Sequence, residues 1–164
     1  GIIVGRKSLI DKLAKHPLAR AARIDKIRLA GLAATLLHYL KDEAASKIPV
    51  WRMIATPLEE LEKRAERWAS SLNGLATAIS GESTVGGGSL PVSTLPTKLV
   101  ALQGKTGSEA EKIARNLRCQ QPPVVGRIDK NAVLLDPRTI LPDDDTALLH
   151  AVSNAIAGEC SQKY

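Results

Sequence analysis

The spacing of hydrophobic residues predicts a strand and two helices in the first part of the chain. Gly1-Ile2-Ile3-Val4-Gly5 is a short β-branched run ended by glycine, which is typical of a buried strand. Residues 8–15 begin with a capping-box pattern and are expected to form a short helix. From residue 18 to residue 40, leucine and isoleucine recur at helical spacing with alanines between them, which predicts one long helix after Pro17.

From residue 41 onward the pattern alternates between helices and strands. Residues 41–47 are polar and expected to be a loop, and residues 48–54 are expected to be extended. Thr56-Pro57-Leu58-Glu59 combines an N-cap threonine, a first-turn proline and a glutamate, so a helix is predicted to begin there. Trp68 falls on the apolar side of this helix, which indicates a core residue. Asn73-Gly74 predicts that the helix ends in a left-handed turn.

Two strands, a helix, a hairpin and a last helix are expected after that turn. Ser108 and Asp143 are the predicted N-caps of the two helices, and Gly158 is the predicted end of the last one. The expected elements are strands 75–79 and 97–102, a helix from 108 to about 118, a hairpin of 124–128 with 132–135, and a helix from 143 to 158. This order predicts a small α+β layer, with a mostly antiparallel sheet and helices on one face.

Composition permits a folded domain and suits an anionic partner. Of the 164 residues, 44% are hydrophobic but only 2% are aromatic, so aliphatic side chains must build the core. The formal net charge of +6 suits a polyanion such as RNA without proving one. Two distant cysteines indicate neither a disulfide framework nor a metal site. No apolar run approaches the ~20 residues of a membrane span, and no signal peptide is visible, so a cytoplasmic protein is expected.

The segment from His16 to Arg28 is the strongest candidate for chemistry. Arg20 and Arg23 are three residues apart, so on one helix their guanidinium groups would point the same way, and Lys26 continues the stripe. Two arginines can hold a tetrahedral oxyanion through fork-like pairs of hydrogen bonds, which lysine does less well. The alternative is a basic helix face that is only solvated.

Two further features are candidates for substrate contacts. Gly87, Gly88 and Ser89 belong to a glycine-rich stretch that either lets a backbone approach a ligand closely or merely forms a flexible turn. Arg127 lies in an otherwise apolar strand, where an arginine is costly unless it is paired. It is expected either to form a buried ion pair, with Asp136 across the hairpin, or to contact substrate.

Several segments together resemble one enzyme family. GIIVG and HPLARAARIDK at the start, GGGSLPVSTLPTK in the middle, and PPVVGRI with LLDPRTI near the end are similar to bacterial L-seryl-tRNA(Sec) selenium transferases, also called selenocysteine synthases. The resemblance extends from Gly1 to about His150, and the order of the segments matches that of the family.

This resemblance implies both a fold class and an activity. The family has the α/β, fold-type-I architecture of pyridoxal-phosphate enzymes and converts seryl-tRNA(Sec) to selenocysteinyl-tRNA(Sec), with selenophosphate as the selenium donor. The resemblance implies that Arg20 and Arg23 bind selenophosphate and that the glycine-rich stretch turns toward the active-site cleft. In fold-type-I enzymes a strand arginine of the small domain often holds a substrate carboxylate, which is the functional interpretation of Arg127. In seryl-tRNA that carboxylate is esterified.

The resemblance also implies that the chain is the C-terminal portion of such an enzyme. The family's Schiff-base lysine is expected before Gly1, so no catalytic residue is expected in this chain, and the fragment is expected to be inactive alone. Residues 1–40 would be the end strand and connecting long helix of the large cofactor domain, and residues 41–164 the small α+β domain. The implied parent is a homo-oligomer built as a ring of dimers. It binds seryl-tRNA(Sec) and selenophosphate, and it is not expected to bind membranes or DNA.

Two alternatives stay open at this point. The first is a non-catalytic basic module for RNA binding or oligomerisation, and the second is a related pyridoxal-phosphate enzyme with another substrate. A glycine-rich segment with a lysine encoded upstream of Gly1 would favour an enzyme. A start codon directly at that position would favour the non-catalytic module.

Overall fold

The computed structural model describes residues 2–86 and 93–159 and divides the chain into two units. Gly1–Ala44 form the first unit and Ala45–Tyr164 form the second. The boundary that the sequence predicts lies after residue 40. The assignment of the first part to a larger cofactor domain stays a prediction. No helix in the described ranges is long and apolar enough to cross a membrane.

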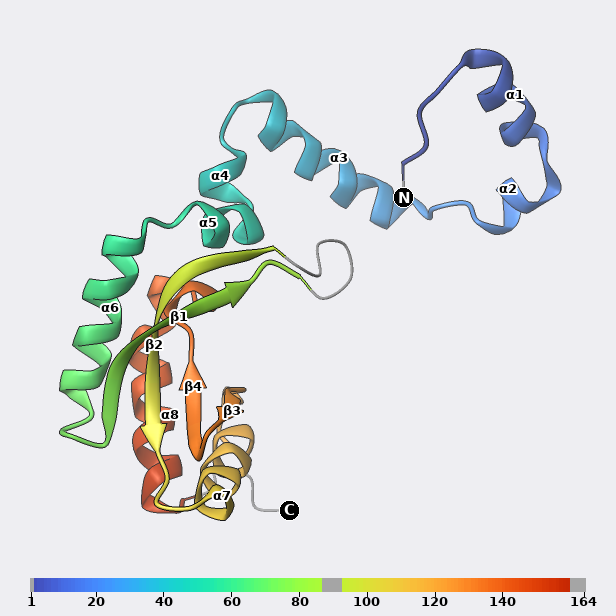
Figure 1. Ribbon diagram of the computed structural model, residues 1–164. Coiled ribbons are helices and arrows are strands. Elements are labelled where there is room, and N and C mark those ends of the chain that lie inside the picture. The colour runs from blue at the N-terminus through green and yellow to red at the C-terminus, as the bar shows by residue number, and fades with distance from the viewer. Residues whose placement is uncertain (1, 87–92, 160–164) are drawn as a thin grey trace. The chain divides into compact units, whose positions relative to one another are not determined.

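The first unit is a succession of helices (Figure 1). His16 separates the first two helices, because its Nδ1 accepts a hydrogen bond from the Leu18 N–H at 3.2 Å and Pro17 then begins the second helix. Asp25 caps the third helix by accepting from the N–H groups of Ile27 and Arg28, at 3.0 and 2.9 Å. The elements are α1 (Lys7–Lys15), α2 (Pro17–Ala21) and α3 (Lys26–Leu40), and α4 (Ala44–Lys47) begins at the boundary.

Three predictions for this unit are wrong. Residues 2–5 form no strand, and Val4 is 86% exposed, because no strand in the described ranges pairs with them. The long helix predicted for 18–40 is interrupted after Ala21. The Asp25 side chain accepts hydrogen bonds from the N–H groups of Ile27 and Arg28, which would otherwise bond to carbonyls of the preceding turn, so a new helix starts there. The helix α1 begins after Arg6, whose side chain makes no capping bond, and not at the predicted serine.

The first unit has no hydrophobic core of its own. None of its described residues is buried. Large apolar side chains such as Leu18, Ile27 and Leu40 are 68%, 85% and 84% exposed. Burial of apolar area is the main stabilising contribution to a fold, and the described residues of this unit provide little of it. The helices of the first unit are therefore stabilised by their caps and by helix propensity.

The second unit is built on a four-stranded antiparallel sheet with the order β1-β2-β4-β3. Across the sheet, Val100 lies opposite Ala78 on one side and Leu135 on the other. Lys130 and Asn131 both have positive φ, as a two-residue hairpin turn requires, and they join the last two strands. The strands are β1 (Ala76–Thr84), β2 (Thr94–Gln103), β3 (Arg127–Asp129) and β4 (Ala132–Leu135). The predicted antiparallel sheet and hairpin are confirmed, although β3 is shorter than predicted.

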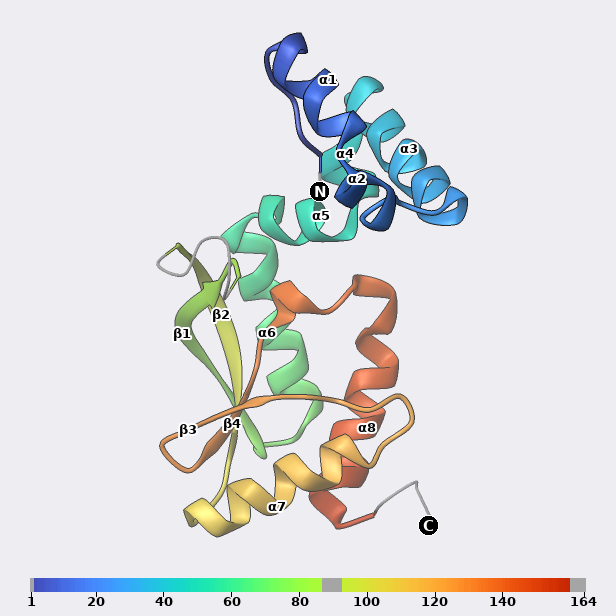
Figure 2. The ribbon, with the colours of Figure 1, turned by 90° about the vertical axis from the view of Figure 1, so that its right-hand side faces the viewer.

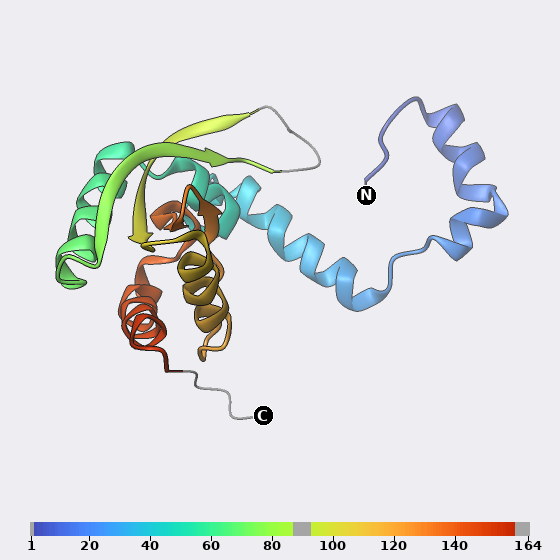
Figure 3. The same ribbon diagram turned by 60° about the horizontal axis from the view of Figure 1, so that its bottom comes forward.

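Helices cover one face of this sheet, as predicted. Figure 2 shows α6 and α8 on the same side of the strands, and Figure 3 shows α7 alongside α8. Trp68, Leu117, Val133 and Val152 are nearly inaccessible in the layer between the helices and the sheet, which confirms Trp68 as a core residue. The elements are α5 (Pro49–Ala55), α6 (Leu58–Ser71), α7 (Gly107–Arg118) and α8 (Asp145–Ala157), with short 3-10 turns η1 (Pro137–Thr139) and η2 (Pro142–Asp144).

The segment ahead of α6 is more helical than predicted. Residues 48–54, expected to be extended, lie mostly in α5, because Pro49 occupies its first helical position. Part of the predicted loop at 41–47 is the short helix α4. Thr56 is not the N-cap of α6, since its hydroxyl donates to the Arg52 carbonyl at the end of α5, at 2.8 Å.

Two later helices begin beside the residue that the sequence favoured. The N-cap of α7 is Thr106, whose hydroxyl accepts from the Glu109 N–H at 3.3 Å, and not Ser108. The helix α8 begins at Asp145 after the turn η2, so the predicted cap Asp143 lies inside that turn. The left-handed end of α6 is confirmed at Asn73 and Gly74, with φ of 49° and 82°, and that of α8 at Gly158, with φ of 87°.

Gly104 connects β2 to α7 and should tolerate no side chain. Its N–H donates to the Asn131 carbonyl at 2.9 Å, and a Cβ built there would lie 2.8 Å from the Ala110 nitrogen. Because the obstacle is backbone, Gly104→Ala should lower the free energy of unfolding by about 1–3 kcal/mol, measured by urea denaturation. Gly86→Ala is the control, since nothing lies within 4 Å of its Cβ position. Equal stability of the two variants would contradict the packing described here.

Candidate functional site

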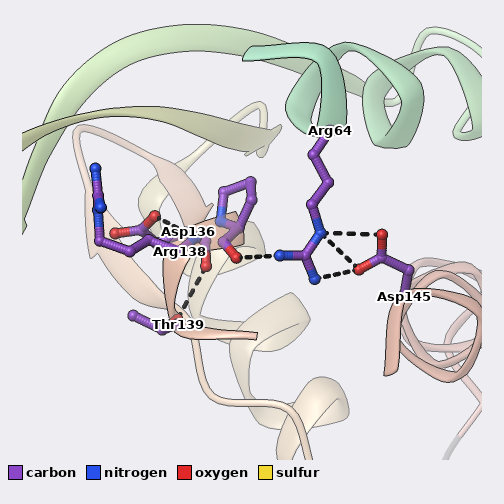
Figure 4. A network of polar contacts seen from close by, with 6 residues as sticks. Arg64, Asp136, Arg138, Thr139 and Asp145 are labelled. Carbon is purple, nitrogen blue, oxygen red and sulfur yellow. Dashed lines mark hydrogen bonds and ion pairs between the residues drawn. The ribbon is translucent and has the colours of Figure 1, made fainter. Parts of the chain in front are cut away.

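Two arginines are buried in the second unit, and the first is Arg64 on α6. Its Nε donates to the Asp145 carboxylate at 2.9 and 3.0 Å, and its Nη2 also contacts that carboxylate. Its Nη1 donates to the Pro137 carbonyl at 2.7 Å, and the guanidinium lies over the Trp68 ring, 5.1 Å from the ring centre. Arg64 therefore joins α6 to η1 and to the start of α8 (Figure 4).

The second buried arginine is Arg138, in η1. Its Nε donates to the Ser83 hydroxyl at 3.1 Å, and its Nη2 donates to the Pro96 carbonyl at 2.7 Å. Its Nη1 lies 3.0–3.3 Å from the carbonyls of residues 53, 54 and 56 at the end of α5. A cation placed against the carbonyls that end a helix is favoured by the helix dipole. Arg138 thus fixes the end of α5 against β1 and β2.

Asp136 holds Arg138 in place. Its carboxylate accepts from the Ser83 hydroxyl at 2.5 Å, from the Thr97 hydroxyl at 3.0 Å and from the Arg138 N–H at 3.0 Å. The Thr139 hydroxyl donates to the Asp136 carbonyl at 2.9 Å, which closes the turn (Figure 4). The LLDPRTI segment therefore forms a tight turn whose polar groups are satisfied by β1 and β2.

These buried arginines line a cavity of about 400 Å³ between α5, α6 and the turn after β4. Their hydrogen bonds already go to Asp145, to the Ser83 hydroxyl and to backbone carbonyls, so their role is structural. Sequence reasoning missed both, because Arg64 looks like an ordinary charged helix position. The one local signal was Asp-Pro-Arg-Thr, in which aspartate can cap a turn that proline starts.

Arg127 lies on the other face of the sheet, which no described helix covers. It pairs with Leu134, and Leu134 pairs with Ala101 of β2, so all three belong to that face. The predicted buried ion pair with Asp136 is wrong. Arg127 is exposed and forms no ion pair within the described ranges, and Asp136 uses its oxygens on Ser83, Thr97 and Arg138. An exposed guanidinium keeps its water and needs no partner.

A pocket of about 210 Å³ opens beside Arg127. Glu82 and Thr84 from the end of β1, Asp136 after β4 and the apolar Val125 also line it. One cationic side chain and two carboxylates therefore face a space large enough for a small polar group. Whether Arg127 contacts substrate stays a prediction.

The basic segment of the first unit is less regular than a single helix face. Arg20 lies in the last turn of α2, Arg23 lies after it, and Lys26 begins α3. The Arg23 N–H still donates to the Arg20 carbonyl at 3.4 Å, so the turn continues and keeps the two residues adjacent. Both arginines are exposed, and neither forms an ion pair in the described part of the chain. The predicted shared helix face is wrong, but both guanidinium groups are exposed and form no ion pair with a described residue.

The remaining predicted contacts, Gly87, Gly88 and Ser89, lie outside the described residues. Among the residues that the structure does describe, no cluster of three or more histidine, cysteine or acidic side chains could hold a metal ion.

Comparison with known proteins agrees with the motif resemblance. The family model described as L-seryl-tRNA selenium transferase matches residues 1–141, which is most of the chain. The chain belongs to the L-seryl-tRNA selenium transferase family. Relatives named L-seryl-tRNA(Sec) selenium transferase include those of Geotalea daltonii, Clostridium perfringens strain 13 and Desulfovibrio desulfuricans, at 44%, 44% and 43% identity over 95%, 93% and 96% of this chain. The chain spans about a third of their length, from 34% to 35%.

Enzymes of fold type I hold pyridoxal phosphate on a desolvated lysine, and the described residues do not fit that requirement. Their lysines are exposed, apart from Lys98, which is half-buried and lies 3.6 Å from Glu62 and 3.5 Å from the Ser80 hydroxyl. Within the described ranges of this chain, no lysine has the surroundings of a cofactor lysine.

Replacing Arg138 should destabilise the second unit strongly. Arg138→Met leaves the carbonyls of residues 53, 54, 56 and 96 without their donor, so we expect a loss of about 3 kcal/mol or more in the free energy of unfolding. The measurement is urea denaturation followed by circular dichroism, where the midpoint should fall. Arg115→Met on the exposed face of α7 is the matched control and should stay within about ±0.5 kcal/mol. Equal midpoints would mean that Arg138 does not carry the network.

Proposed function

We propose that the chain is the C-terminal portion of an L-seryl-tRNA(Sec) selenium transferase. The parent enzyme would convert seryl-tRNA(Sec) to selenocysteinyl-tRNA(Sec), with selenophosphate as the selenium donor. The observation that carries this proposal is the family match over residues 1–141, together with relatives that bear this name. Because the chain spans about a third of those relatives, the activity belongs to the parent and not to this portion alone.

Arg20 and Arg23 are the residues that we assign to selenophosphate. They are adjacent, exposed and not committed to ion pairs, so their donors are free to bind a ligand. A guanidinium presents parallel N–H groups that match two oxygens of a tetrahedral anion, and two guanidinium groups can neutralise its charge. Lys26 begins α3 nearby in the sequence and is assigned as a further contact.

The remaining parts of the site are assigned to the parent. Pyridoxal phosphate would supply the electron sink for exchange at the serine β-carbon, and its lysine would lie outside this chain. The parent would be a cytoplasmic homo-oligomer, arranged as a ring of dimers, that binds seryl-tRNA(Sec). The net charge of +6 suits this polyanionic substrate.

The other interpretations receive less support. A non-catalytic RNA-binding or oligomerisation module is not favoured, because the curated relatives quoted above carry the name of an enzyme. A pyridoxal-phosphate enzyme with another substrate is also less well supported, because the names of these relatives specify seryl-tRNA(Sec).

In the full-length enzyme, Arg20→Ala or Arg23→Ala should lower selenium transfer sharply and change seryl-tRNA affinity little. A small anion depends on the few groups that contact it, whereas a tRNA spreads its attraction over many phosphates. Arg20→Lys and Arg23→Lys should also fail substantially, because the planar fork is lost. The measurement is a selenophosphate titration at saturating seryl-tRNA.

The control for this titration is Arg28→Lys. Arg28 is exposed in the same segment but lies beside Asp25, at 3.4 Å, so exchange for lysine should leave transfer unchanged. If both lysine variants have the same selenophosphate concentration at half-saturation and the same maximal rate as the parent enzyme, Arg20 and Arg23 are only surface charges. A loss of tRNA affinity in step with activity would place them in the RNA interface instead.

The 164-residue chain by itself should not bind pyridoxal phosphate covalently at a defined lysine. Its described lysines are exposed apart from Lys98, which is half-buried and lies beside Glu62 and the Ser80 hydroxyl, so none has the apolar surroundings of a cofactor lysine. The test is incubation with pyridoxal phosphate, borohydride reduction and mass-spectrometric mapping. Scattered low labelling is the expected result, and stoichiometric labelling of one lysine would refute it.

A further inference from the structure

The pocket beside Arg127 carries an inference that deepens the proposed function and rests on it. We infer that this pocket binds the sugar-phosphate unit of the terminal nucleotide of the aminoacyl-RNA substrate. Arg127 would contact the phosphate, and Asp136 and Glu82 would accept hydrogen bonds from a ribose hydroxyl. The sequence suggested a carboxylate as the partner of Arg127, and the structure points to a different anion.

The serine-bearing end of an aminoacyl-RNA offers Arg127 one kind of anion. In a seryl ester of RNA the serine carboxylate is esterified and carries no charge, so the nearest anion at that end of the substrate is the phosphodiester. Arg127 is exposed and free of ion pairs in the described part of the chain, so its fork of donors is available. A guanidinium binds two phosphate oxygens at once, which fixes both position and orientation.

Two carboxylates, those of Asp136 and Glu82, also line the pocket. The Asp136 carboxylate is held by Ser83, Thr97 and the Arg138 N–H, so its direction is fixed before any ligand arrives. Glu82 is exposed and forms no ion pair with any described cation. Carboxylates recognise ribose hydroxyls by accepting their protons, as in dinucleotide-binding folds. Two carboxylates would repel a free phosphate dianion, whereas a phosphodiester carries one charge and brings hydroxyl donors with it.

The volume and the lining of the pocket suit part of a nucleotide. The volume of about 210 Å³ suits a ribose with its phosphate but leaves a base outside. Val125 lines the same pocket and is 75% exposed, so an apolar surface is available where a base would lie. The pocket adjoins the second buried cluster of the sheet, and its lining residues Glu82, Thr84 and Arg127 are exposed, so an extended end of RNA can approach it.

The test is a titration of the isotopically labelled 164-residue chain by NMR, with the methyl ester of adenosine 5′-monophosphate, a phosphodiester with one charge, as the nucleotide probe. We expect shifts at the Arg127 Nε–H and at the amides of Thr84 and Val125. Adenosine, which lacks the phosphate, and the methyl ester of 2′,3′-dideoxyadenosine 5′-monophosphate, which lacks the hydroxyls, should each bind roughly tenfold more weakly. Inorganic phosphate should bind more weakly than the nucleotide for the same reason.

Variants separate the two ends of the pocket. Arg127→Ala should abolish the shifts from the nucleotide, and Glu82→Gln should weaken binding while removing the advantage over the dideoxy analogue. Arg115→Ala, which removes an exposed arginine of α7, should bind as the parent chain does. Asp136 is not replaced, because its variants would disturb the turn that it caps.

Several results would overturn the inference. Equal binding of adenosine and the nucleotide probe would remove the phosphate contact, and equal binding of inorganic phosphate would leave a simple anion site. Shifts from L-serine without shifts from the nucleotide would restore a carboxylate ligand. Unchanged binding by Arg127→Ala would exclude Arg127. Selenium transfer by the full-length enzyme is measured separately, so a parent that transfers selenium without this binding refutes the pocket and not the proposed function.

Discussion

The hydrogen bonds of the Arg138 guanidinium join β1, β2 and the end of α5, and the second unit is arranged around them. A buried guanidinium without hydrogen-bond acceptors nearby would greatly destabilise the fold. These carbonyls and the Ser83 hydroxyl therefore have to be in place when η1 packs. The Asp136 carboxylate is the nearby negative charge, and it accepts hydrogen bonds from the Ser83 hydroxyl and from the Arg138 backbone N–H. Arg64 repeats the arrangement with Asp145 and Pro137. The turn after β4 is therefore held from both sides.

This constraint also shapes the pocket beside Arg127. Asp136 contributes one carboxylate to the buried network and to the pocket wall at the same time. The rigid turn thus presents a pre-oriented acceptor, while Arg127 at the start of β3 stays exposed and forms no ion pair with a described residue. A fixed group and a free group in one small space suit a ligand that is positioned at one end and captured at the other.

The two units divide the physical work differently. The second unit has a continuous core between its sheet and helices, whereas none of the first unit's described residues is buried, and caps at His16 and Asp25 shape it. The arginine pair assigned to selenophosphate lies in the first unit, next to the break between α2 and α3. Exposure leaves Arg20 and Arg23 free to bind an anion, and the turn between them keeps them adjacent.

The sequence by itself determined the features that depend on local backbone geometry. The left-handed end of α6 at Asn73 and Gly74, the end of α8 at Gly158, a hairpin that turns within residues 129–131 and the apolar side of α6 were all predicted, because each follows from the residue types or spacing of neighbouring residues. The family motifs were readable for the same reason, since they are contiguous.

Only the tertiary structure decided which arginines are buried and which strand forms. Arg138 bonds to carbonyls more than 80 positions earlier, so no local pattern could distinguish its role from that of Arg127. The run at 2–5 has strand propensity but no neighbour among the described strands, and a strand needs one for its hydrogen bonds. Helix starts moved by a residue or two for a similar reason, because Thr56 found a carbonyl of the preceding helix to bond. Local preference proposes an element, and distant partners decide whether its polar groups are satisfied.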